Sequence, residues 1–408
     1  MLEFARRFDR VRGLYSAARA FASPRAPCAG SLPFYSIKRH YLTVSIPNMN
    51  VSPRPYLTAA LAGIGGEIKN HPEDFEVEEI PLYEPEGDGH HAYLWVEKCG
   101  VTGQQLISDL ARHFDVPKRD IGAAGIKDKH ALTRQWVSIP FFEVPTDDPA
   151  ELIGEVSPRI KVLDAKLHRN KLRTGHLQGN RFRVVVRDLA LPGEEALARA
   201  QAILAVLGAQ GLPNYYGAQR FGIEGQTLAL GVALLRGEKE AKNRVRRNRF
   251  MKRLAVSAVQ SELFNRVLIA RLEKGILSTA LDGDVAQKTD TNGVFAIPAD
   301  ELAECQGRLE RGEIVLTGPM PGPKMIAPER AAQEFEEGVF AASGFDLSLF
   351  EQQARLASGT RRPLLVDTGD LTVELETRDD QEVLVLGFSL PSGSYATVLL
   401  REIMKSDA

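Results

Sequence analysis

The chain has 408 residues, 44% of them hydrophobic and 25% charged, and this length predicts two domains rather than one ordinary core. The formal net charge of −2 excludes a globally basic protein, so any affinity for nucleic acid must come from local clusters. No apolar run approaches the roughly 20 residues that span a bilayer, and three isolated cysteines (Cys28, Cys99 and Cys305) exclude a disulfide framework and a Cys-x-x-Cys zinc site, so we expect a soluble protein of a reducing compartment.

Residues 1–50 are rich in arginine and contain only two acids, Glu3 and Asp9. This composition is typical of an organellar transit peptide. The alternatives are that Met49 is the true start of the protein, or that the segment is a disordered extension. In each case we expect residues 1–50 to contribute little to the fold.

The first structured region is predicted to begin near Leu61. Residues 75–80 alternate apolar and acidic side chains, which predicts a half-buried strand. Residues 84–89 are typical of a hairpin loop, and residues 92–97 are then predicted to be the returning strand. Thr102 is a predicted N-cap for an amphipathic helix.

A lone carboxylate follows this helix. Asp128 lies between Lys127 and Lys129, after Gly125, and the chain then continues into a strand-like segment at 136–139. Flanking ammonium groups would keep the carboxylate ionised and lower its pKa, and an ionised carboxylate can attack carbon or take a proton. Gly125 would let the backbone turn sharply or approach a ligand. The alternative is an ordinary solvated turn.

Between residues 165 and 186 the chain contains no acid. The basic residues of this region and its borders are Lys166, His168, Arg169, Lys171, Arg173, His176, Arg181, Arg183 and Arg187. Residues 181–187 are strand-like, which predicts a sheet edge that grips phosphate. Asn180 offers an amide for a base edge and Phe182 an aromatic face, although Phe182 could equally be a core residue.

The second half of the chain begins with a predicted helix at 194–207, ended by the glycines before Pro213. A second basic run at 242–253 leads into an amphipathic helix closed by Gly275. Compensating acids in 73–86 and 329–337 predict that the basic residues share one positive face; a solvated surface is the alternative.

A last pair of strands is predicted at 371–376 and 382–390. These terminal strands have no obvious partners within 211–360. We therefore expect an insertion architecture, in which residues 51–210 and 361–408 form one domain and residues 211–360 form a second domain inserted into it.

The sequence of residues 125–136, Gly-Ile-Lys-Asp-Lys-His-Ala-Leu-Thr-Arg-Gln-Trp, resembles the active-site signature of the TruD family of tRNA pseudouridine synthases. Further stretches that resemble the family occur in the family's order: 71–77, 168–173 with 179–182, 213–222, and 390–397 before 400–402. The resemblance extends from about Gly65 to the C-terminus.

This resemblance implies an α+β fold, with a mixed or antiparallel sheet of the pseudouridine synthase type and an inserted α+β domain facing it across a cleft. It implies isomerisation of a uridine in tRNA, at position 13, by a cytoplasmic monomer without cofactor or metal. Asp128 would be the catalytic residue, acting as nucleophile at the sugar or as a base that assists glycal formation.

The resemblance also implies roles for other side chains. Phe75 and Phe182 would support the uracil ring, Asn180 would hold its polar edge, and Lys69 or Arg401 would position Asp128. Lys127 is a further expected substrate-binding residue. The expected RNA-binding residues are Arg169, Lys171, Arg173, Arg181, Arg246, Arg247 and Arg249.

Two other functions remain open at this point. A non-catalytic RNA-binding module would explain the basic stretches but gives no reason for the lysine-bracketed Asp128. A glycosidase or nucleoside hydrolase would also use a carboxylate but needs a second one as acid or base. No second carboxylate lies near Asp128 in the sequence.

Overall fold

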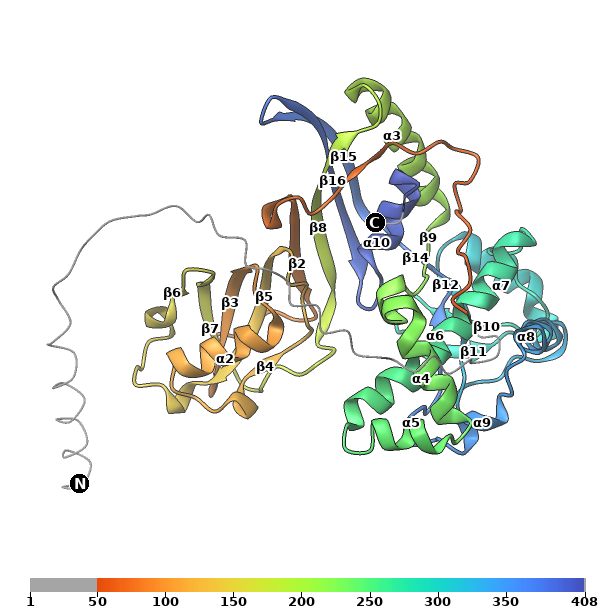
Figure 1. Cartoon of the computed structure of the whole chain (residues 1–408), viewed down its shortest axis with the longest axis horizontal. Helices are drawn as coiled ribbons and strands as arrows, with labels where there is room; N and C mark the ends of the chain where they lie inside the picture. The colour runs from red at the N-terminus through yellow and green to blue at the C-terminus, as the bar shows by residue number, and fades with distance from the viewer. Residues whose placement is uncertain (1–49, 407–408) are drawn as a thin grey trace, which may run out of the picture. The chain divides into compact units, whose positions relative to one another are not determined.

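The computed structural model of the chain describes residues 50–406, and the expectations for residues 1–49 lie outside this range. Within it, a large sheet is followed along the chain by a mainly helical segment, and the last two long strands return to the large sheet (Figure 1). No helix of the described part is long and apolar enough to cross a membrane.

The large sheet has ten strands, eight of which form the order β15-β16-β8-β2-β5-β3-β7-β6. The short strands β1 (Gly65–Glu67) and β4 (Gly122–Ala123) pair with β8 and β5. Only β2 and β5 pair in parallel, so the expected mixed sheet of an α+β protein is confirmed. The eight strands are β2 (Phe75–Pro81), β3 (His91–Cys99), β5 (Leu132–Pro140), β6 (Gly154–Ser157), β7 (Ile160–His168), β8 (Leu177–Leu189), β15 (Gly369–Arg378) and β16 (Gln381–Pro391).

The prediction that residues 75–80 and 92–97 form a hairpin was wrong. Both segments are strands, but β5 lies between β2 and β3 and pairs with each of them. Nearly every residue of β5 is buried, so this strand takes a central place in the sheet. Alternation of side chains reveals a strand but does not determine its partner.

Three helices cover one face of the large sheet. In α2 (Gly103–His113) the Thr102 hydroxyl accepts a hydrogen bond from Gln105 N at 3.1 Å, which confirms the predicted cap. The predicted second helix is α3 (Gly193–Gln210), which ends at Gly211 with φ 83°. Helix α10 (Ala396–Met404) packs with α3 in the largest apolar core.

Residues that pair across neighbouring strands share a face of the sheet. One such row crosses five strands: Lys98 of β3, Thr133 of β5, Val77 of β2, Phe182 of β8 and Phe388 of β16. The apolar residues of this face pack against α2 at one end and against α3 and α10 at the other. The row therefore crosses the sheet between two helix-covered regions.

Residues 212–366 contain most of the remaining elements. Helices α4 (Gln226–Leu235) and α6 (Arg249–Glu273) pack together, and α6 also contacts the second sheet. That sheet has the order β11-β10-β12-β13, and a small ladder joins β14 to β9. The remaining bounds are α5 (Lys239–Arg244), α7 (Leu302–Glu310), α8 (Arg330–Ser343), α9 (Ser348–Glu351), β9 (Leu212–Pro213), β10 (Val285–Lys288), β11 (Val294–Ala296), β12 (Ile314–Met320), β13 (Thr360–Pro363) and β14 (Leu365–Val366).

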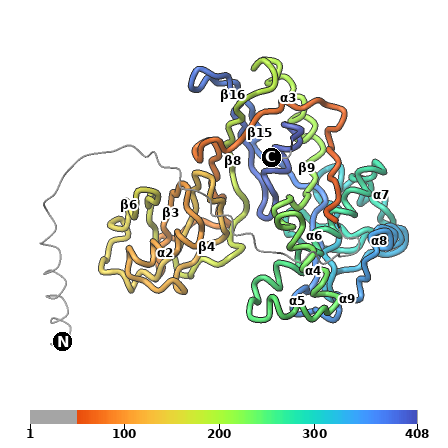
Figure 2. The backbone as a smooth tube through the Cα atoms, viewed as in Figure 1, coloured from red at the N-terminus to blue at the C-terminus, as the bar shows by residue number. Residues whose placement is uncertain are grey.

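The C-terminal hairpin lies beside strands from the first half of the chain (Figure 2). Strand β16 pairs with β8 over residues 384–391, and β15 continues the sheet outward. The tight turn between β15 and β16 consists of Asp379 and Asp380, both in the left-handed region that such two-residue turns require. Residues 360–363, by contrast, pair with β12 in the second sheet. The division into two domains stays a prediction.

Candidate active site

Asp128 lies on the loop between β4 and β5. The start of this loop is held by close backbone packing: Gly175 N donates to Ala124 O at 2.8 Å, and a Cβ on Gly122 would lie 2.2 Å from Leu172 O. Gly122 is thus the glycine that the loop requires. A Cβ on Gly125 would meet only Leu177, at an ordinary 3.9 Å, so within the protein this position leaves space, and close approach of a ligand at Gly125 stays a prediction.

The Asp128 carboxylate pairs with Lys69. Lys69 Nζ lies 2.7 Å from Asp128 Oδ2 and 4.5 Å from the centre of the Phe75 ring. The backbone of Lys69 is left-handed, with φ 64°, a conformation that costs roughly 1 kcal/mol or more for an L-residue. Three of the expected site residues, Lys69, Phe75 and Asp128, are therefore brought together.

The ionised state of Asp128 has a different cause from the predicted one. Burial by itself would raise the pKa of Asp128, but the hydrogen bond and charge of Lys69, with the backbone N–H groups of His130 and Lys129, hold it below its ordinary value. The predicted flanking ammonium groups do not pair with the carboxylate: Lys127 contacts other partners and Lys129 is exposed.

Lys127 is buried and joins two further site residues. Its Nζ lies 3.0 Å from Glu79 Oε2 and donates to Asn180 Oδ1. Burial raises the pKa of Glu79 and lowers that of Lys127, and in each case the partner's opposite charge counteracts the shift. Because an ammonium can only donate, the Asn180 oxygen must face Lys127, which leaves the amide NH2 directed elsewhere.

Asn180 and Phe182 are alternate residues of β8 and lie on the same face. A Cβ on Gly179 would lie 2.3 Å from Leu390 O, so β8 and β16 approach closely at this point. The Phe182 ring stacks on Phe388 at 5.1 Å and meets the Phe75 ring edge-on at 6.2 Å. Phe182 is 7% exposed and belongs to the main core, and a role under the uracil ring stays a prediction.

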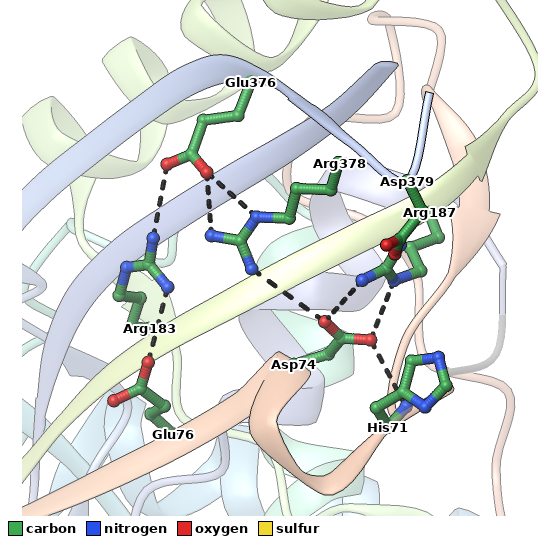
Figure 3. Close-up of polar contacts among 8 residues, drawn as sticks. All are labelled: His71, Asp74, Glu76, Arg183, Arg187, Glu376, Arg378 and Asp379. Atoms are coloured by element: carbon green, nitrogen blue, oxygen red, sulfur yellow. Dashed lines mark hydrogen bonds and ion pairs between the residues drawn. The ribbon is translucent and has the colours of Figure 1, made fainter. Parts of the chain in front are cut away.

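The segment that carries Lys69 and Phe75 is fastened to the sheet by a buried ion pair (Figure 3). Asp74, at the end of the short 3-10 helix Pro72–Asp74, accepts from Arg187 Nε at 2.8 Å and Nη2 at 3.1 Å, and from His71 N at 3.2 Å. Arg187 also reaches Asp379 in the C-terminal turn. Burial would raise the pKa of Asp74, but Arg187 holds it below its ordinary value.

Lys98 is a site residue that the sequence did not reveal. Its side chain is 0% exposed, and its Nζ donates to the carbonyl oxygens of Val101 and Asp128, each at 2.8 Å. Burial lowers the pKa of Lys98 to about 8, against the opposing effect of the Asp128 charge. The catalytic candidate is thus held by Lys69 at its carboxylate and by Lys98 at its backbone.

The basic strand 181–187 does not form a phosphate-gripping sheet edge, because β8 is an inner strand between β16 and β2. Arg181 points away from Asn180 and Phe182, to the opposite face, and pairs with Glu78 at 3.1 Å. On that face Arg183 bridges Glu76 and Glu376 (Figure 3). The acids of 74–78 therefore neutralise the basic residues of β8 directly. The prediction that these basic residues are separated from the acids on one positive face was wrong for this strand.

The other expected RNA-binding residues lie in two places. Arg169 pairs with Glu86 and Asp88, Lys171 donates to Arg119 O, and Arg173 is exposed on the loop that packs on Ala124. Arg246, Arg247 and Arg249 are exposed around the start of α6, where a cavity of about 650 Å³ is lined by Asn243, Arg244, Arg246, Arg247 and Asn248.

Two further expectations concern Arg401 and metals. Arg401 lies on α10, with its guanidinium 3.8 Å from the centre of the Tyr56 ring. Among the described residues, no group of three or more His, Cys, Asp or Glu side chains is arranged to hold a metal ion.

Comparison with known proteins agrees with this fold. A solved structure described as a putative tRNA pseudouridine synthase D from Methanosarcina mazei superposes with a TM-score of 0.72 at 26% identity, covering 88% of this chain and 97% of that one. The sequence model of the family tRNA pseudouridine synthase D (TruD) matches residues 52–246 and 239–403. The fold is therefore that of a pseudouridine synthase.

Curated relatives specify the family. Proteins named tRNA pseudouridine synthase D from an Anaeromyxobacter species and from Thermus thermophilus are 44% and 41% identical to this chain. Each alignment covers 87% of this chain, with 97% and 93% of the relative. The chain belongs to the TruD family.

Proposed function

We propose that this protein converts uridine 13 of tRNA into pseudouridine and that Asp128 is the residue that carries the reaction. Membership of the TruD family makes the chain an isomerase of the tRNA pseudouridine synthase type. The modified position follows from the family resemblance of the Asp128 motif. A cytoplasmic location and a monomeric state are parts of the same proposal.

The single observation that carries the role of Asp128 is its pairing with Lys69 on an accessible loop. The carboxylate is 41% exposed and ionised, so a ribose can reach it and it is ready to act as nucleophile or base. The reaction breaks the N1–C1′ bond and forms a C5–C1′ bond, while C5 loses a proton and N1 gains one. Atoms and electrons balance without any added reactant.

The fixed amide of Asn180 supports a uracil-binding role. Because Lys127 occupies the Asn180 oxygen, Asn180 presents N–H donors to the site, and these match a uracil carbonyl. Cytosine carries an amino group where uracil has O4, and two donors facing each other would leave both unpaired. Such mismatches allow large discrimination between substrates.

A uridine stacked inside RNA is inaccessible to a carboxylate, so the target base must leave the stack, at a cost of a few kcal/mol. Phosphate contacts from the exposed arginines offset this cost. The exposed Phe250, 69% accessible and next to Arg249, adds an aromatic surface to the basic group at the start of α6.

The test is incubation of the purified protein with an unmodified tRNA transcript, followed by mapping of pseudouridine at single-nucleotide resolution. We expect one new pseudouridine, at position 13, and none in a transcript with cytidine there. Modification at another position would refute the assignment of uridine 13. Release of free uracil without pseudouridine would identify a nucleoside hydrolase instead.

A further inference from the structure

We propose that Lys98 is a positioning residue for the reaction: its buried ammonium holds the Asp128 peptide so that the carboxylate faces the ribose. This inference rests on the proposed role of Asp128. Lys98 lies near the end of β3, a strand that supplies none of the expected substrate contacts. In this proposal it holds the catalytic loop from the side opposite to the substrate.

The geometry gives Lys98 two anchors on different elements. Val101 O precedes α2, and Asp128 O belongs to the loop between β4 and β5; the ammonium bridges them with hydrogen bonds of 2.8 Å each. Since Lys98 pairs with Thr133 of β5 on one side and with Ile160 of β7 on the other, its own position is fixed by the sheet. Lys98 therefore anchors the backbone of Asp128 to the sheet.

The burial of Lys98 is costly and unusual. Within residues 50–406, no carboxylate forms an ion pair with its ammonium, and both hydrogen bonds go to neutral carbonyl groups. An uncompensated buried charge opposes folding. The neighbouring Thr133 hydroxyl is also buried and has no hydrogen-bond partner among the described residues. Polar groups held at such cost are typical of functional sites.

The charge of Lys98 also acts on the site. The charged and titratable groups around it are Asp128 and Lys127 on the loop and Cys99 on its own strand. Burial raises the pKa of the Cys99 thiol, and Lys127 is paired with Glu79, whereas burial lowers the pKa of Lys98 to about 8. Its deprotonation removes the positive charge behind Asp128 and weakens both hydrogen bonds to the carbonyl groups, because hydrogen bonds from a charged donor are the stronger ones.

Two consequences have opposite signs. As pH rises from about 8 toward the ordinary lysine pKa of 10.5, the folded protein has released this proton and the unfolded chain has not, so Lys98 contributes increasing stability. Over the same range the rate of isomerisation falls, because the hydrogen bonds that hold the Asp128 peptide weaken. A loss of rate by unfolding would be accompanied by a loss of stability.

The experiment uses the full chain and single-turnover rates on the tRNA transcript. Lys98→Met and Lys98→Gln should lower the rate by about 10- to 100-fold, as expected for a displaced catalytic group, with tRNA affinity within about threefold of wild type. The matched control is Lys161→Met, an exposed lysine on β7, which should leave both quantities unchanged.

The ratio of wild-type to Lys98→Gln rates should be largest below pH 7.5 and shrink as pH passes about 8, because only the wild-type side chain titrates. Taking this ratio cancels the pH effects of the RNA and of other groups. If these variants fold poorly, Lys98→Arg replaces them: arginine keeps its charge throughout this pH range, so the ratio of wild-type to Lys98→Arg rates should fall as pH passes about 8.

A fully active Lys98→Met protein, or a rate ratio that is constant from pH 6.5 to 9.5, would overturn the positioning role. These outcomes differ from failure of the proposed function, which would appear as full activity of Asp128→Asn. If Asp128→Asn is inactive and Lys98→Met is fully active, only the inference about Lys98 fails.

Discussion

The ion pair between Lys69 and Asp128 allows a quantitative prediction for Lys69→Met. Among residues 50–406, Lys69 is the one lysine that forms an ion pair with this carboxylate, and the substitution removes its ammonium while keeping an unbranched side chain over the Phe75 ring. Burial of Asp128 remains and still raises its pKa. The pKa of Asp128 in the variant should therefore rise.

The size of the shift follows from the exposure of the pair. The side chains are 27% and 41% exposed, so solvent screens them, and exposed pairs are typically worth about 0.2–1 kcal/mol. At 1.36 kcal/mol per pKa unit, this corresponds to a rise of roughly 0.2–0.7 units. Asp128 stays ionised at pH 7, so we attribute the expected loss of rate there, about 10-fold, to a carboxylate that is less well oriented.

The assay is the pH dependence of kcat/KM between pH 4 and 8, whose acid limb reports the free enzyme's essential carboxylate. The limb should move to higher pH in Lys69→Met and stay in place in Lys129→Met. Lys129 is next to Asp128 in sequence but exposed, and only its backbone N–H supports the carboxylate. Equal shifts in both variants, or none in Lys69→Met, would refute this account.

Three other predictions test the surroundings of the site. If Phe182 lies under the uracil, Phe182→Leu should melt near wild type but react slowly, whereas Phe182→Tyr should keep much of its activity; a fully active Leu protein would remove Phe182 from the site. Asp74→Asn should lower the free energy of unfolding in urea by about 2–3 kcal/mol at pH 7, because the nearly buried guanidinium of Arg187 loses its two-point carboxylate partner and keeps only the exposed Asp379. This loss should shrink as pH falls below about 4, since the depressed pKa of Asp74 means that its contribution disappears on protonation; an undiminished loss would contradict the pairing. Neutralising the exposed Arg246, Arg247 and Arg249 around the start of α6 should weaken the salt dependence of tRNA binding. The slope of log affinity against log salt should fall by up to about 0.9 for each lost phosphate contact, and an unchanged slope would make these arginines ordinary surface residues.

Local features of the fold could be predicted from the sequence because they depend on neighbouring residues. The hydroxyl of Thr102 marks the start of α2 and the glycine at 211 marks the end of α3. The strand-like residues of 371–376 and 382–390, on either side of Asp379 and Asp380, mark the C-terminal hairpin. The pairing of β5 between β2 and β3 was missed, because apolar alternation is the same whichever strand lies alongside.

The site shows the same limit. Lys69 and Asp128 are separated by 59 residues, Lys127 and Asn180 by 53, and Lys98 and Asp128 by 30, so none of these contacts follows from local spacing. One signal for Lys98 was available. Because side chains alternate along β3, Lys98 lies on the same face as the buried Val96, and a lysine is unexpected on the apolar face of a strand. The prediction of a phosphate-binding edge at Arg181 and Arg183 was wrong because the glutamates that pair with these arginines lie about a hundred residues earlier in the sequence.

The most direct test of the central claim is the single-turnover rate of Asp128→Asn on the tRNA transcript, measured beside its tRNA affinity. The substitution is nearly isosteric and leaves the amide in reach of Lys69 and the His130 N–H. The account predicts no detectable pseudouridine and a Kd within about tenfold of wild type, because affinity comes mainly from phosphate contacts. Pseudouridine formation at a rate near wild type would contradict it.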